Sequence, residues 1–121
     1  MSVGELPPQI QQEILRLQQM QQQYELIAAQ RNQSELQLRE TERALAELGN
    51  IDADTTVYKS VGTLLIKVDR DPTKKELSDQ KETLEIRVKT LKRQEEQLKK
   101  QIQDATTKIQ AKLERRGAGA S

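Results

Sequence analysis

The sequence predicts a mostly α fold: a long antiparallel two-helix coiled coil with one central β-hairpin. Apolar residues recur every seven positions in residues 8–48 and again in residues 72–115, which is the repeat of a coiled-coil seam. Between these segments, residues 54–68 contain the stretch VYKSVGTLLIKV, which is β-branched and apolar around one glycine. We expect one domain over residues 1–121, in which the hairpin joins hairpins of other chains into a sheet or barrel that forms a platform between subunits.

The composition favours such a coiled coil over a globular core. The chain of 121 residues contains no Phe and no Trp, and charged residues make up 32% of it. Leu, Ile and Val together number 28, which is close to the level of disordered chains. These residues suffice if they lie in stripes along two helices, because a two-helix seam needs few of them.

The first helix is predicted over residues 8–48. Pro7 and Pro8 suit its start, and Gly49 suits the C′ position just past its end. The tract QQMQQQ keeps the apolar repeat, which favours helix because Gln is a fair helix former; the alternative is a disordered, aggregation-prone tract. The seam consists of two series of residues, the combs, in which each residue lies seven positions after the one before. They comprise Ile10, Leu17, Tyr24, Arg31, Leu38 and Leu45, and Met20, Ile27, Ser34, Thr41 and Leu48.

The second helix is predicted over residues 72–115. Either Asp71 caps it with Pro72 in the first turn, or Thr73 caps it with Glu76 as in a capping box. Residues 116–121 are expected to form a disordered tail. The two combs comprise Leu77, Leu84, Leu91, Leu98 and Ala105, and Lys74, Lys81, Val88, Glu95, Ile102 and Ile109.

The charge distribution is compatible with antiparallel packing. Residues 1–73 carry 7 Lys and Arg against 11 Asp and Glu, whereas residues 74–121 carry 13 against 8. Opposite net charges favour folding the second helix back on the first, although the same pattern also arises from ordinary solvated faces. The termini would then lie at one end of the coiled coil and the hairpin at the other.

The hairpin is predicted to be an assembly device. An isolated two-stranded hairpin is marginal in water, and its open edges invite pairing. Joining hairpins from several chains would bury its apolar side chains and pair its edges; the alternative is a hairpin that caps its own coiled coil. The turn lies at Val61-Gly62 or Gly62-Thr63. The predicted assembly residues are Val57, Tyr58, Val61, Gly62, Leu64, Leu65, Ile66 and Val68.

Several classes of function are disfavoured. The chain has no His, no Cys and no glycine-rich phosphate loop, so we expect no catalytic residues, no metal site and no cofactor. No apolar run approaches the length of a membrane span, and MSVGELPPQ lacks the features of a secretory signal. We therefore expect a cytoplasmic protein that binds no membrane. The basic residues of the second helix alternate with Glu, and no aromatic residue is available for stacking, so nucleic-acid binding is not expected.

The segments ERALAEL (42–48), VYKSVGTLLIKV (57–68) and KETLEIRVKTLKRQEEQLKKQI (81–102) together resemble the β-type subunit of archaeal prefoldin. The resemblance extends from about Pro7 to Leu113, and the single hairpin is similar to the β class, since α-class subunits carry two. It implies a hexamer of two α and four β subunits whose hairpins form a double β-barrel. It also implies an ATP-independent chaperone that holds unfolded client proteins at its coiled-coil tips and passes them to a group II chaperonin.

The expected client-binding residues are the apolar groups near both termini, where helix ends can fray. They are Ile10, Ile14, Leu17, Met20, Ile102, Ile109 and Leu113. The alternative function is a structural coiled-coil tether or scaffold without client binding. A tether would explain the seven-residue repeats but would leave the hairpin without a purpose.

Overall fold

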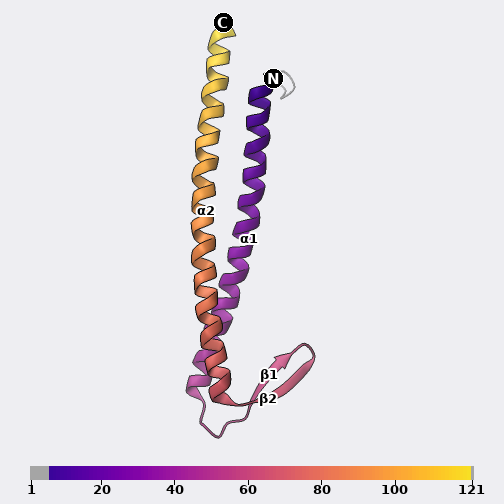
Figure 1. Cartoon of the computed structure of the whole chain (residues 1–121), viewed down its shortest axis with the longest axis vertical. Helices are drawn as coiled ribbons and strands as arrows, with labels where there is room; N and C mark the ends of the chain where they lie inside the picture. Colours follow the sequence, from indigo (N-terminus) through magenta and orange to yellow (C-terminus); the bar gives the residue numbers. More distant parts are fainter. Residues whose placement is uncertain (1–5, 121) are drawn as a thin grey trace. The chain divides into compact units, whose positions relative to one another are not determined.

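The computed structural model describes residues 6–120. It contains helix α1 (Pro8–Asn50), strands β1 (Val57–Val61) and β2 (Leu64–Val68), and helix α2 (Arg70–Ala120) (Figure 1). The chain divides into two compact units that are described separately. Unit 1 holds the described residues of Met1–Gln30 and Thr90–Ser121, and unit 2 is Arg31–Lys89.

Helix α1 begins where the two prolines predict and ends slightly later than expected. The Gln11 N–H donates to the Pro7 carbonyl at 3.1 Å, which makes Pro8 the first helical residue. The expectation that Gly49 follows the helix at C′ is wrong, because α1 includes Gly49 and Asn50. Among the described glycines only Gly62 has a positive φ, so Gly49 does not adopt the left-handed conformation of such a cap. Instead, Arg70 Nε donates to the Leu48 carbonyl at 3.1 Å and satisfies one group at the helix end.

Helix α2 begins earlier than either predicted cap. The Thr73 N–H donates to the Asp69 carbonyl at 3.2 Å, so Asp69 occupies the N-cap position and Arg70 is the first helical residue. Both predictions for this cap, at Asp71 and at Thr73, are therefore wrong. Pro72 is tolerated because the first N–H groups of a helix have no intrahelical acceptor. Asp71 lies in the first turn, where its charge complements the helix dipole.

The end of α2 also differs from the expectation. A disordered tail was expected from residue 116, yet the backbone is helical to Ala120; Ser121 lies outside the described residues. Alanine is the strongest helix former, and one glycine in a helix costs only about 1 kcal/mol relative to alanine. The GAGA run therefore does not force the helix to stop.

The core of unit 1 is the predicted seam. The first part of α1 packs against the last part of α2 in this unit, and the two helices run antiparallel (Figure 1). Ile27, Leu91 and Leu98 form a buried cluster against which Tyr24 packs. All four belong to the seven-residue combs, which confirms that part of the predicted seam. The buried apolar residues of this unit are Leu6, Ile10, Ile27, Leu91, Leu98 and Ile109.

Unit 2 continues the seam with polar interruptions, as its combs predict. Leu48, Leu84 and Val88 are buried together with Ser34 and Thr41. The Thr41 hydroxyl donates to the Gln37 carbonyl of its own helix at 2.8 Å, so its burial leaves no unpaired donor. A seam with such polar positions gains less from apolar burial than the cluster of unit 1.

The hairpin is a two-stranded antiparallel sheet with a defined turn. Val57 pairs with Val68, and Val61 pairs with Leu64, which leaves Gly62 and Thr63 as a two-residue loop. Gly62 has φ +60° and no other described residue has a positive φ, which identifies a type II′ turn. This assigns the turn to Gly62-Thr63 among the two predicted alternatives.

We predict that replacing a residue of the buried cluster destabilises the chain far more than replacing an exposed aliphatic residue. Leu91→Ala should lower the free energy of unfolding by about 2–5 kcal/mol, because Leu91 is buried in the cluster. Ile86→Ala, at a side chain that is 61% exposed, is the control and should change it by about 0.5 kcal/mol or less. Urea unfolding followed by helical circular dichroism measures both, and equal losses would contradict the assigned seam.

We also predict opposite effects for two glycine substitutions. A Cβ added at Gly62 or at Gly49 meets no atom within 4 Å, so only the backbone decides the outcome. Gly62→Ala should destabilise by about 1–2 kcal/mol, because its φ is positive. Gly49→Ala should stabilise by about 0.5–1 kcal/mol, because Gly49 lies in a helix. The same unfolding experiment tests the pair; a stabilised Gly62→Ala variant would be incompatible with the type II′ turn.

Candidate functional site

Two surfaces of the chain are candidates for binding other proteins. The hairpin surface consists of β1, β2 and their turn, in unit 2. The terminal groove is a hollow of unit 1 between α1 and α2. The hairpin surface contains the predicted assembly residues, and the terminal groove contains two predicted client-binding residues, Met20 and Ile109.

The register of the hairpin distributes its apolar side chains over both faces. Because directly paired residues share a face and faces alternate along a strand, the pairs Val57–Val68 and Val61–Leu64 lie on one face. Ile66, paired with Lys59, lies on this face as well. The other face carries Tyr58 and Leu65, paired with Lys67 and Ser60. Neither face of the hairpin is therefore purely polar.

The far part of the hairpin is uncovered. Leu65 is 72% exposed and Leu64 is 64% exposed, and Tyr58, Val61 and Ile66 are exposed as well. In the described part of the chain the sheet has only β1 and β2, so the outward backbone groups of both strands have no strand partner there. The alternative that the hairpin caps its own coiled coil does not describe this structure, because the cap would have covered these side chains.

One ion pair and two half-buried valines connect the hairpin to the rest of unit 2. Lys59 Nζ lies 3.1 Å from Glu76 Oε1 of α2, and Val57 and Val68 are half-buried. Next to them is a hollow of about 470 Å³. Its lining is mostly apolar and includes Ala44, Leu48, Ile51, Val57 and Leu77. The hairpin is thus anchored at its base and exposed at its turn.

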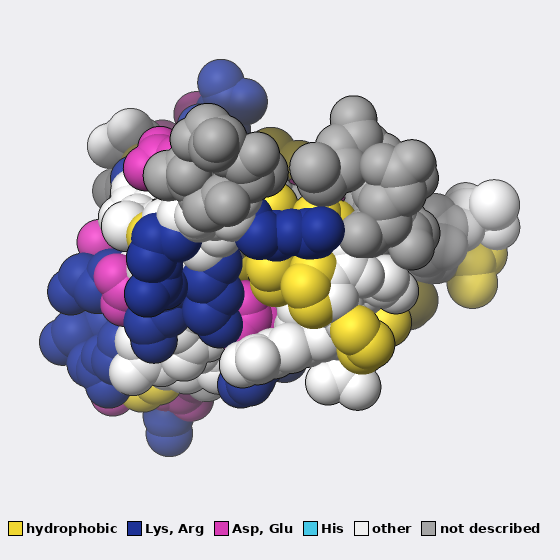
Figure 2. Space-filling view, turned by 90° about the horizontal axis from the view of Figure 1, so that it is seen from above, with side chains coloured by type: hydrophobic (Ala, Val, Ile, Leu, Met, Phe, Trp, Pro, Cys, Tyr) yellow, Lys and Arg dark blue, Asp and Glu magenta, His cyan; other side chains and the backbone are white. Residues whose placement is uncertain are grey.

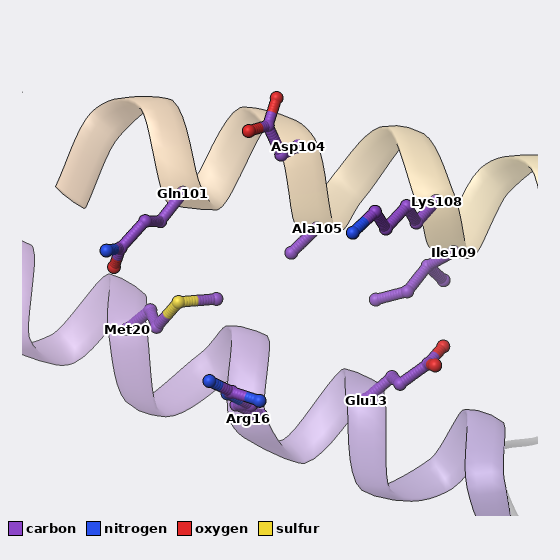
Figure 3. Close-up of a pocket in the computed structure, with 8 residues that line it drawn as sticks. All are labelled: Glu13, Arg16, Met20, Gln101, Asp104, Ala105, Lys108 and Ile109. Carbon is purple, nitrogen blue, oxygen red and sulfur yellow. The ribbon is translucent and has the colours of Figure 1, made fainter. Parts of the chain in front are cut away.

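The terminal groove is lined by apolar side chains from both helices. Met20 of α1 points toward Ala105 and Ile109 of α2 (Figure 3). The hollow is about 390 Å³ in volume. It exists because Ala105 occupies a comb position that carries leucine at residues 77, 84, 91 and 98. The missing side-chain volume leaves the seam open at this level.

Charged groups surround the groove with both signs. Arg16, Asp104 and Lys108 line it together with Glu13. Lys112 Nζ donates a hydrogen bond to Glu13 Oε1, which links α2 to α1 beside the hollow. Glu13 Oε2 is buried and accepts no hydrogen bond from the described residues. Because the charges nearly balance, the groove offers apolar burial rather than attraction for one sign of charge.

The face shown in Figure 2 carries hydrophobic side chains gathered in a patch beside Lys and Arg side chains.

The predicted client-binding residues differ in their accessibility. Ile10 and Ile109 are buried in the seam of unit 1. Ile14, Leu17, Met20 and Ile102 are half-buried, and Leu113 is exposed. Only Met20 and Ile109 of this set line the groove. The seam is closed at Ile10 in this structure.

Two features of these surfaces went unrecognised in the sequence. The groove at Ala105 could have been found from the small residue that interrupts the leucine comb. The exposed Leu15 and Leu26 of α1 lie outside the seven-residue combs. Their spacing relative to the combs was the signal that could have placed them together on the outer side of the helix.

No helix in the described part of the chain combines the length and the apolar character that a membrane span requires.

Comparison with known proteins gives one consistent family. The family model "Prefoldin subunit" matches residues 11–116. The prefoldin subunit beta of Archaeoglobus fulgidus is 49% identical over 108 residues, which cover 89% of this chain and 93% of that protein. The prefoldin subunit beta of Sulfolobus acidocaldarius is 43% identical over 119 residues, which cover 95% of each chain.

Solved structures agree with the sequence relatives. The crystal structure of the prefoldin beta subunit from Thermococcus strain KS-1 is similar with a TM-score of 0.79 and 38% identity, covering 90% of this chain and 96% of that one. The prefoldin beta2 subunit from the same strain shares the fold, with a TM-score of 0.67 at 18% identity. The two antiparallel helices and the central hairpin are thus the prefoldin β fold. This chain therefore belongs to the prefoldin family as a β-type subunit, a coiled-coil subunit with a chaperone role and no enzymatic one.

Proposed function

We propose that this chain is the β subunit of a hexameric holdase, in which four β chains and two α-type chains join through their hairpins. The complex captures unfolded proteins at the coiled-coil tips and delivers them to a group II chaperonin. The exposed apolar hairpin carries this proposal, because a chain with a chaperone role has no evident use for it outside an assembly. A cytoplasmic location stays a prediction from the sequence.

Assembly follows from the energetics of the hairpin surface. Burying a large aliphatic side chain contributes about 1.5–3 kcal/mol, and Leu64, Leu65 and Ile66 are all exposed in the single chain. Strand pairing with a neighbouring hairpin would satisfy the open edges at the same time. Since both faces and both edges offer contacts, hairpins from several chains can continue into a closed barrel.

Client capture is supported by the terminal groove. Met20, Ala105 and Ile109 give it an apolar lining, and a methionine adapts to ligands of different shape. The sequence holds no glycine-rich loop that could bind a triphosphate, so we propose capture without ATP. Delivery to a chaperonin is proposed from the family resemblance.

A tether or scaffold without client binding is the competing function. A tether needs neither an exposed apolar hairpin nor a gap in its seam, whereas both are present. The two functions differ most clearly in the oligomer formed with an α-type subunit, which a tether would not require.

We predict that two lysines in the hairpin abolish assembly. Leu64→Lys with Ile66→Lys places charges on one face of the hairpin and should weaken assembly by about 3–6 kcal/mol per subunit. Helical circular dichroism should stay near that of the parent. The control, Ser78→Lys with Thr83→Lys, adds the same charge at exposed helix positions. Light scattering after co-expression with an α-type subunit gives the masses of the complexes. A high-mass complex of the hairpin variant would contradict the proposal that the hairpin joins the subunits.

We further predict that filling the terminal groove reduces client capture. Ala105→Leu completes the leucine comb and should raise the free energy of unfolding by about 1–2 kcal/mol. The same change should reduce protection of a denatured test protein against aggregation, with and without ATP. Ala111→Leu, at an exposed position outside the groove, is the matched control. If the Ala105→Leu variant protects as well as the parent, clients do not use the groove; a need for ATP would contradict the proposed holdase.

A further inference from the structure

The outer side of α1 in unit 1 carries a second ordered row of side chains. This row, the outer stripe, has the alternating spacing of three and four residues that places side chains on one face of a helix. Every member is exposed. Leu15 is 57% exposed and Leu26 is 59% exposed. The outer stripe consists of Gln12, Leu15, Gln19, Gln22 and Leu26.

The stripe faces away from the seam. Gln12, Gln19, Gln22 and Leu26 follow comb positions by two residues, and Leu15 follows the groove-lining Glu13 by two. Two residues correspond to a rotation of about 200° around the helix. Because Ile10 is buried against the seam, the stripe is presented to solvent without any opening of the two helices.

The stripe contains no ionisable side chain. The corresponding outward positions of α2 in unit 1 include charged residues, namely Arg93, Lys100 and Glu114. The outer face of a coiled coil usually carries such charges. The two outer faces of unit 1 therefore differ, and only the one on α1 would accept an uncharged partner without removing charges from water.

The exposed area limits what can bind there. Two separated leucines fall far short of the roughly 1,200 Å² that a specific interface between folded proteins buries. A second copy of this chain or a folded partner would gain too little. An unfolded segment needs only local contacts, since several weak contacts on one complex can add up through multivalency.

We propose that the outer stripe binds extended, uncharged segments of client proteins. Leu15 and Leu26 take two apolar side chains of the client. The amides of Gln19 and Gln22, which both donate and accept hydrogen bonds, pair with backbone N–H and C=O groups that an unfolded chain leaves free. Eleven helical residues separate the leucines by about 16 Å, which equals about five residues of extended client. This inference rests on the proposed client capture and assigns it a contact surface that is present while the seam is closed.

The test replaces both leucines by glutamine in the full-length chain, assembled as the parent is. Leu15→Gln with Leu26→Gln keeps helix propensity nearly unchanged and leaves the seam intact. The control is Leu36→Gln with Ile86→Gln, the same change at exposed positions of unit 2. The probes are a denatured test protein, whose aggregation is followed by light scattering, and a fluorescent uncharged ten-residue peptide with two leucines five residues apart.

We expect the stripe variant to assemble and unfold like the parent but to bind the peptide about tenfold more weakly. Its protection of the test protein should fall in parallel, while the control matches the parent. Peptide binding should change little between low and moderate salt, because the stripe carries no charge. If the stripe variant binds the peptide and protects the test protein as well as the parent does, the inference is wrong while the proposed function stands. Equal losses in the control variant would have the same meaning. A parent that protects no test protein would instead overturn the proposed function.

Discussion

The scarcity of large apolar side chains is the constraint on which this structure depends. A chain without Phe or Trp cannot build a broad core, so its aliphatic residues lie in combs along two helices. The resulting seam is narrow: the buried apolar residues of both units are Leu6, Ile10, Ile27, Leu48, Leu84, Val88, Leu91, Leu98 and Ile109. Apolar side chains that do not fit this seam stay at the surface, where they are available to other proteins.

Each candidate surface is a consequence of that narrow seam. The hairpin holds apolar residues that neither helix covers, and Leu65 is the most exposed large one described. The groove arises where Ala105 is too small to fill the seam beside Met20. The outer stripe occurs where Leu15 and Leu26 interrupt a run of glutamines on the opposite side of α1. Most of the candidate binding residues therefore lie outside the buried seam, and Ile109 belongs to both the seam and the groove.

Much of the fold could be predicted from the sequence because it depends on the spacing at which apolar residues repeat. The seven-residue combs predicted the burial of Ile27, Leu91 and Leu98, and the glycine between two apolar runs predicted the hairpin. Helix ends were less predictable, since they depend on single hydrogen bonds such as the one between Thr73 and Asp69. Accessibility was the least predictable property: Ile109 and Leu113 looked equivalent in sequence, but one is buried and the other exposed. That difference depends on how the two helices pack, which spacing alone does not determine.

Hydrogen exchange followed by mass spectrometry tests the central claim, which is that the hairpin joins subunits while unit 1 holds clients. The measurement compares the isolated chain, its complex with an α-type subunit, and that complex with a denatured client. On assembly, we expect amides of residues 57–68 to become strongly protected, because their open edges would be paired. On client addition, further protection should be confined to peptides from residues 6–30 and 90–117. Hairpin amides that exchange equally fast in the isolated chain and in the complex would contradict the account.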